Sequence, residues 1–196
     1  MSTPTLFDQT PAAGLTSRPA AVTHPLVIGL DLSLTCTGIA GAGWSDIVRT
    51  KLRGDARLDY LLITVGSFIK AADMVVMEGP SYGHANLAGH EELAGLRCSV
   101  RLYCHRRKIP YGIVPPSSLK MFATGRGNAA KGEIRSAIAD RYGHHTEGAG
   151  RYDEADAYTA MAMGLHHLGY PLAAVPDRNA RALDGCAWPE FAAGAR

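Results

Sequence analysis

Short apolar runs alternate with stretches of helical periodicity through the middle of the chain. Apolar runs bounded by glycine, proline or polar residues predict buried strands, and apolar residues recurring every three or four positions predict helices. The predicted strands cover residues 26–33, 37–44, 44–52, 73–80 and 109–115, with the first two forming a hairpin. The predicted helices cover residues 57–69, 86–108, 131–142 and 152–168, and a further helix opens at Pro116. Strands that gather early and then alternate with helices predict an α/β domain with a mixed central β-sheet flanked by helices.

Both ends of the chain differ from this middle part. Residues 1–24 are rich in Thr, Pro, Ala and Ser and lack periodicity, which predicts a flexible arm. Residues 170–196 carry three prolines and three arginines with little periodicity, which predicts a loosely packed tail. The folded domain is therefore expected to span residues 25–169.

Composition limits the class of protein. The 196 residues suffice for one compact domain, and 20 lysines and arginines against 18 acids give a net charge of +2. No apolar stretch approaches the roughly 18 residues of a membrane span, and no basic segment followed by an apolar run marks a secretory signal. The four cysteines form no C-x-x-C pair. We therefore expect a cytoplasmic protein with free thiols and no membrane partner.

Four acidic residues occupy positions where acids are normally unfavourable. Asp31 interrupts the apolar run VIGLDLSL, and Glu78 ends the run MVVM. Asp153 and Asp156 stand three residues apart on one face of the predicted helix DEADAYTAMAMG. Singly, each has an ordinary explanation as a turn former, a solvated strand end or an acid favoured by the helix dipole. Together they predict a carboxylate cluster that a divalent cation neutralises, and oxygen ligands favour Mg²⁺ or Mn²⁺ over Zn²⁺.

Four segments together resemble one known family. GLDLSLTCTGIA, VVMEGPSYG, PPSSLKMFATGRGNAAKGEI and DEADAYTAMAMG, in this order, are similar to the RuvC family of Holliday junction resolvases, and the EGPSYG segment is most similar to phage-type members. The resemblance implies a ribonuclease H-like fold and a homodimeric crossover junction endodeoxyribonuclease without a nucleotide cofactor. It further implies two Mg²⁺ ions per active site, replaceable by Mn²⁺, and paired symmetric nicks in a four-way DNA junction that leave 5′-phosphate and 3′-hydroxyl ends. A bacterial or phage-infected cytoplasm is the implied location.

The resemblance also assigns residue roles. It implies that Asp31, Glu78, Asp153 and Asp156 are the catalytic metal ligands. Two lysines match active-site lysines of the family: Lys131, which acts near the scissile phosphate, and Lys120. Tyr82 lies near the position of an aromatic residue that wedges into the junction centre. The predicted helix 86–108 corresponds to the long helix through which the family dimerises.

Because the net charge is small, DNA binding must come from local charge. One basic group stands within twelve residues that contain no acid: Arg97, Arg101, Arg106, Arg107 and Lys108. A second group surrounds the lysines: Lys120, Arg126, Lys131 and Arg135. A basic helix face is often only solvated surface, but phosphate contacts are the functional interpretation. The predicted DNA-binding residues are Tyr82, Arg97, Arg101, Arg126, Lys131 and Arg135.

Other functions remain open from the sequence. A nuclease of the same fold that acts on forks, flaps or RNA–DNA hybrids has the same two-metal chemistry, so the carboxylates do not separate these substrates. A junction-binding protein with an idle site is the non-enzymatic alternative, which the presence of all four carboxylates and both lysines disfavours.

Overall fold

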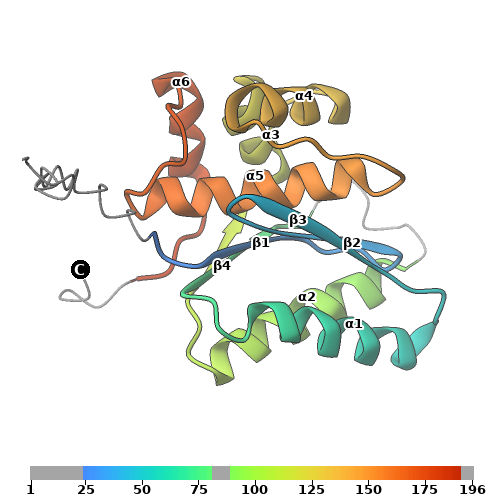
Figure 1. Ribbon diagram of the computed structural model, residues 1–196. Coiled ribbons are helices and arrows are strands. Elements are labelled where there is room, and N and C mark those ends of the chain that lie inside the picture. The colour runs from blue at the N-terminus through green and yellow to red at the C-terminus, as the bar shows by residue number, and fades with distance from the viewer. Residues whose placement is uncertain (1–23, 81–88, 191–196) are drawn as a thin grey trace, which may run out of the picture.

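A five-stranded mixed sheet forms the centre of the computed structural model, which describes residues 24–80 and 89–190 (Figure 1). The strands are β1 (Val27–Asp31), β2 (Cys36–Gly41), β3 (Trp44–Arg49), β4 (Met74–Glu78) and β5 (Tyr111–Val114). Their order in the sheet is β3-β2-β1-β4-β5. The β1–β2 and β2–β3 pairs are antiparallel, whereas the β1–β4 and β4–β5 pairs are parallel. Strands β1, β4 and β5 therefore all end at the same edge of the sheet.

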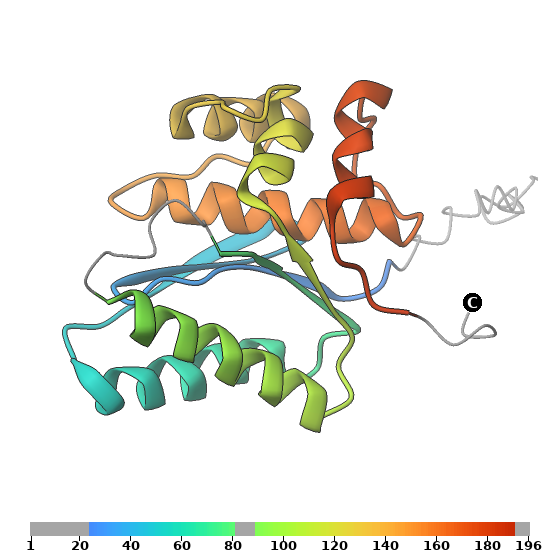
Figure 2. The same cartoon turned by 180° about the vertical axis from the view of Figure 1, so that it is seen from behind.

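Helices cover both faces of this sheet (Figures 1 and 2). Two helices pack on one face: α1 (Gly54–Ile69) and α2 (His90–Arg106). On the opposite face, α5 (Arg151–His167) crosses β1, β2 and β4. Beyond α5 lie the shorter helices α3 (Pro116–Thr124), α4 (Lys131–Tyr142) and α6 (Asp177–Ala180). No described helix is both long and apolar enough to cross a bilayer.

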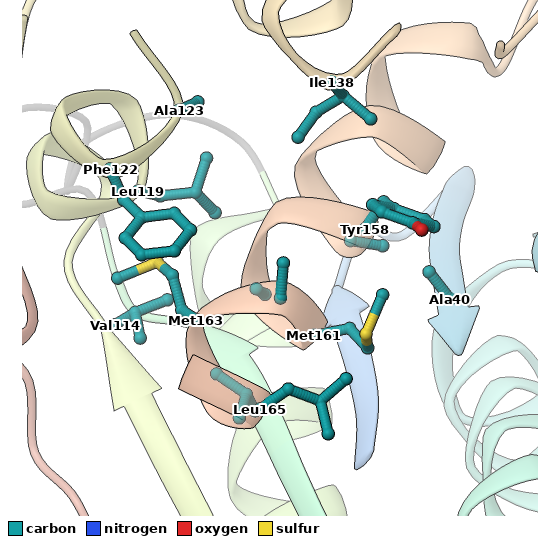
Figure 3. Packing of buried hydrophobic residues seen from close by; sticks show 14 of the residues in the cluster. Ala40, Val114, Leu119, Phe122, Ala123, Ile138, Tyr158, Met161, Met163 and Leu165 are labelled. Atoms are coloured by element: carbon teal, nitrogen blue, oxygen red, sulfur yellow. The ribbon is translucent and has the colours of Figure 1, made fainter. Parts of the chain in front are cut away.

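Helix α5 is enclosed on every side. All residues from Ala155 to Leu165 are buried, between the sheet below and α3 and α4 above (Figure 3). A helix enclosed in this way needs no polar face, which explains why its sequence is small and apolar all round. Strand glycines let its backbone approach closely, because a Cβ at Gly29 would overlap the Ala157 carbonyl and one at Gly38 would overlap the Asp153 carbonyl. This close approach fixes the first turns of α5 against the sheet.

Side chains alternate between two cores along the strands. Ile28 and Leu30 of β1 point towards α1 and α2, where they meet residues such as Leu61 and Leu96. Val27 points to the opposite side, into the core that α5 shares with α3 and α4. Phe122, Tyr158 and Met163 are central residues of that second core (Figure 3).

The sequence predictions for the middle of the chain agree with the structure. Each predicted strand and helix is present, with ends that shift by a few residues: the helix expected over 57–69 begins at Gly54, and the strand expected over 26–33 ends at Asp31. The mixed sheet flanked by helices is confirmed. The predicted flexible arm falls almost wholly outside the described residues, which begin at residue 24.

The C-terminal segment is more ordered than its sequence suggests. Residues 170–190 contain α6 and the 3-10 helix η2 (Arg181–Gly185) instead of a loose tail. Ile113 of the edge strand β5 exchanges two backbone hydrogen bonds of 2.9 Å with Ala187. The Trp188 indole donates a 2.9 Å hydrogen bond to the Leu183 carbonyl. Hydrophobic periodicity does not predict this order, because the segment is held by a single aromatic residue, Trp188, and by one backbone bridge between Ile113 and Ala187.

Candidate active site

Two buried strands each end in a carboxylate at the same edge of the sheet. Asp31 is the last residue of β1 and Glu78 the last of β4, and the register pairs the preceding residues, Leu30 and Met77. The two carboxyl groups consequently lie next to each other and share a hydrogen bond. A carboxyl can donate such a bond only when one of the pair keeps its proton.

Helix α5 adds two carboxylates, and α4 adds a cation. Asp153 and Asp156 occupy the first turns of α5, and Asp156 is only 6% exposed. Lys131, the first residue of α4, places its Nζ 3.9 Å from Asp153 Oδ1 and 3.9 Å from Asp156 Oδ2. The charges of all four carboxyl groups act on Lys131. The structure thus gathers five predicted site residues from four elements.

Burial raises the pKa of three of these acids, Asp31, Glu78 and Asp156. Burial, and then the charges of Asp31 and Asp156, raise the pKa of Glu78 to about 9. Burial, and then the charge of Asp31, raise the pKa of Asp156 to about 7. The pKa of Asp31 is also raised, chiefly by burial. Burial alone would lower the pKa of Lys131, but the surrounding carboxylates outweigh it and raise that pKa.

The donor set fits a hard divalent cation. The four acidic side chains that converge here offer carboxylate oxygens, the ligands that Mg²⁺ and Mn²⁺ prefer. A cation would take the place of the protons that burial keeps on Glu78 and Asp156. Among the described side chains, no three His, Cys, Asp or Glu residues form a ready-made metal cluster. A cation at this site would be held by the carboxylates in their ionised form, so its binding would release protons.

Two further predicted residues lie near the carboxylates. The charge of Lys120, on α3, acts on Asp156. The charge of Arg97, on α2, acts on both Asp31 and Glu78. The sequence indicates Arg97 as a DNA-binding residue on charge alone, and the fold places it near the carboxylates of Asp31 and Glu78. Tyr82, the predicted wedge, lies outside the described residues.

Two of the other predicted DNA-binding arginines, Arg126 and Arg135, already have partners within the protein. Arg126 forms an ion pair with Glu133, which also accepts a 2.8 Å hydrogen bond from the Ala130 backbone N–H. Arg135 donates a 2.8 Å hydrogen bond from Nε to the Thr146 carbonyl. These contacts hold the segments on either side of α4, so both residues have a structural role whether or not they also contact phosphates.

Ser45, Glu154 and His144 form a hydrogen-bonded cluster beside the site, which we call the polar clamp, and the sequence does not predict it. Ser45, on β3, donates a 2.6 Å hydrogen bond to Glu154 Oε2, and His144 Nε2 lies 2.9 Å from the same hydroxyl. The His144 ring stacks on Tyr158 with centroids 4.2 Å apart. The clamp ties β3 and the segment before α5 to the first turn of α5, which carries Asp153. Ser45 is 99 residues from His144 and 109 from Glu154 in the sequence, so no local pattern signals these contacts.

Comparisons with known proteins agree with this geometry at the level of the fold. No family model and no curated protein sequence matches the chain. The structure of Thermus thermophilus RuvC matches with a TM-score of 0.60 and 16% identity, over 77% of this chain and 99% of that chain. The same RuvC in complex with a Holliday junction substrate gives 0.60 and 18%, over 78% and 100%. A third match, the yeast mitochondrial Holliday junction resolvase Ydc2, has a TM-score of 0.48 and 13% identity, over 81% and 80%.

The predicted fold is confirmed by these matches: the chain has the ribonuclease H-like fold of RuvC. The family resemblance noted in the sequence agrees with them, since the structures of highest similarity reported above are RuvC.

Proposed function

We propose that this protein is a RuvC-like, metal-dependent endonuclease that resolves four-way DNA junctions. The observation that carries the proposal is the convergence of Asp31, Glu78, Asp153 and Asp156 beside Lys131 on a RuvC fold. Burying acids such as Glu78 and Asp156 costs stability, and acids with raised pKa values gather at functional sites. The solved complex of RuvC with a Holliday junction substrate supports branched DNA as the ligand class.

The residues divide the chemistry between them. Divalent cations, when bound, supply an activated water and charge neutralisation for in-line phosphodiester hydrolysis. The four carboxylates would hold two such ions, with Asp31 central because it neighbours Glu78 on one side and the α5 pair on the other. Lys131, close to both α5 carboxylates, is placed to stabilise negative charge on the phosphate. Products with 5′-phosphate and 3′-hydroxyl ends follow from attack on the phosphorus with departure of the 3′ oxygen.

Paired nicks need two active sites, and the outward face of α2 offers a surface on which two copies could meet. Val100 and Cys104 of α2 face the sheet, which leaves Cys98 and Leu102 exposed on the opposite side. Leu102 is 45% exposed, so a second copy packed on this face of α2 would cover it. We therefore propose a two-fold homodimer formed through α2.

Leu102→Glu is expected to convert the dimer to a monomer, because it places a charge in the proposed apolar seam. Sedimentation equilibrium at about 20 µM, a concentration well above the Kd of a stable dimer, measures the mass. The matched control is Leu172→Glu, because Leu172 is also exposed, to 36%, but lies outside α2. A wild-type protein that sediments as a monomer, or a Leu102→Glu variant that stays dimeric, would rule out this seam.

The substrate is tested by comparing branched DNAs. Wild-type protein with Mg²⁺ is incubated with a four-way junction, a Y-fork, a flap, an RNA–DNA hybrid and plain duplex. We expect paired nicks at symmetric positions in the junction and at least tenfold slower cutting of the others. Equal cutting of forks and flaps would instead show a general branched-DNA nuclease. Tight junction binding without cutting would show the idle-site alternative.

A further inference from the structure

One side of α2 carries a row of basic side chains. On this helix Val100 and Cys104 are buried against the sheet, and the Tyr103 hydroxyl donates a 3.0 Å hydrogen bond to the Gly66 carbonyl of α1. Each residue turns the helix by about 100°, so the side opposite Tyr103 faces away from α1 and towards the edge strand β5. The basic residues on that side, which we call the α2 basic row, are Arg97, Arg101, His105 and Lys108, the last just beyond the helix end.

A groove lies between the far end of this row and β5. It has a volume of about 620 Å³, and Arg101, His105 and Lys108 line it with exposed side chains. The Arg101 guanidinium lies 5.9 Å from the centre of the Tyr111 ring on β5. Trp188, held by the C-terminal segment, completes the wall. Among the described residues that line this groove, Glu190 is the only acid.

The groove and the carboxylates lie at opposite ends of the sheet. Tyr111 begins β5, whereas Asp31 and Glu78 end the parallel strands β1 and β4. The charge of Arg97 acts on those two carboxyls, so one end of the row lies at the candidate active site. The nine steps from Arg97 to the end of α2 at Arg106 rise about 14 Å, and Lys108 lies just beyond that end. That rise corresponds to about four nucleotides of one strand in duplex DNA.

We propose that the α2 basic row and its groove bind the phosphate backbone of a DNA arm as it leaves the cleavage site. This proposal rests on the proposed function and adds to it the path of one arm. The exposed Arg101 and Lys108, opposed by a single acid in the groove, favour a polyanion, and the spacing of the row at successive helical turns suits successive phosphates. The concave wall of Tyr111 and Trp188 distinguishes it from a merely solvated helix face. Arg101 and Leu102 point about 100° apart on α2, so the row and the proposed dimer contact are adjacent but distinct surfaces of the helix.

The test measures junction binding in EDTA, so that it does not depend on cleavage. The double variant Arg101→Gln/Lys108→Gln is compared with Lys70→Gln/Arg181→Gln, which removes two exposed cations outside the groove. Arg97 is left unchanged because it acts on the carboxylates. We expect the groove variant to bind a four-way junction roughly tenfold more weakly at 0.15 M salt, and the slope of log K against log salt to flatten by about 1.8, or 0.9 per lost phosphate contact. The control should match wild type.

Uncharged phosphates in the DNA provide a second, independent measurement. Methylphosphonate linkages about four nucleotides from the nick are expected to weaken wild-type binding but not binding by the groove variant. Two results would overturn the proposed path of the DNA arm and leave the proposed function intact. One is an unchanged salt slope for junction binding by the groove variant, and the other is an equal effect of the methylphosphonates on both proteins. A wild-type protein that binds no branched DNA would overturn the proposed function itself. Equal thermal melting of the variants and wild type excludes unfolding as the cause.

Discussion

Gly38→Ala is expected to destabilise the protein by about 3 kcal/mol or more, because the added methyl group must displace backbone rather than a movable side chain. The new Cβ would overlap the carbonyl group of Asp153, in the first turn of α5. Helix α5 is packed between the sheet and α3 and α4, so it has little room to shift away. Any shift that does occur moves Asp153 and Asp156 relative to Asp31. Urea unfolding measures the loss of stability, and Mn²⁺ calorimetry measures the effect on the carboxylates.

Gly132→Ala is the matched control. A Cβ at Gly132 meets nothing within 4 Å, and the residue lies at the start of α4, where alanine favours the helix. We expect this variant to be as stable as wild type or up to about 1 kcal/mol more stable. Wild-type stability in Gly38→Ala would show that α5 does not lie against β2 as the structure has it.

In the absence of metal, the protein is expected to become less stable as the pH rises from about 5 to about 9. The pKa of Glu78 is about 9 in the folded protein against an ordinary 4.5, chiefly because of burial, and that of Asp156 is about 7 against 3.8. Between the two values of each group the folded state binds more protons than the unfolded state, so stability falls with increasing pH across that window. One pKa unit corresponds to about 1.4 kcal/mol, but the charge of Asp156 is itself one cause of the raised pKa of Glu78, so the two shifts are not additive and we expect a total loss of several kcal/mol.

Glu78→Gln should remove much of this dependence, because glutamine cannot ionise. Urea unfolding at pH 5.5, 7.0 and 8.5 in EDTA (values chosen within the window of the shifted pKa) measures the effect, with the exposed Glu147→Gln as control. Mg²⁺ should restore stability at the highest pH in wild type but less in Glu78→Gln, since the cation needs the ionised carboxylate. A metal-free wild type whose stability stays level or rises with pH would contradict the electrostatics of the site.

Much of the site could be predicted from the sequence because its positions follow from local patterns. Asp31 and Glu78 each end an apolar run, and runs of that kind form neighbouring buried strands whose ends meet. Asp153 and Asp156 share a helix face through their spacing alone. The position of α5 was less accessible to periodicity, because a helix buried on all sides has no amphipathic stripe. Only the strand glycines reveal how closely it approaches the sheet.

The parts that sequence reasoning missed depend on contacts between distant segments. The hydrogen bonds that join Ser45 to Glu154 and His144 become visible only when β3 lies beside α5. Arg126 and Arg135 read as free cations in the sequence, yet each binds a protein group in the fold. The position of Trp188 is also not predictable from the sequence, because hydrogen bonds within an irregular segment place its ring in the wall of a groove.

Cleavage of a labelled four-way junction by wild type and Asp31→Asn tests the central claim most directly. Each protein is incubated with Mg²⁺ or with EDTA, and both pairs of opposite strands are mapped at nucleotide resolution. We expect wild type with Mg²⁺ to place paired symmetric nicks with 5′-phosphate ends, and removal of the central carboxylate or the metal to slow them by at least about a thousandfold. Nicking by folded Asp31→Asn at the wild-type rate, or nicking that persists in EDTA, would contradict a metal-dependent site at these carboxylates.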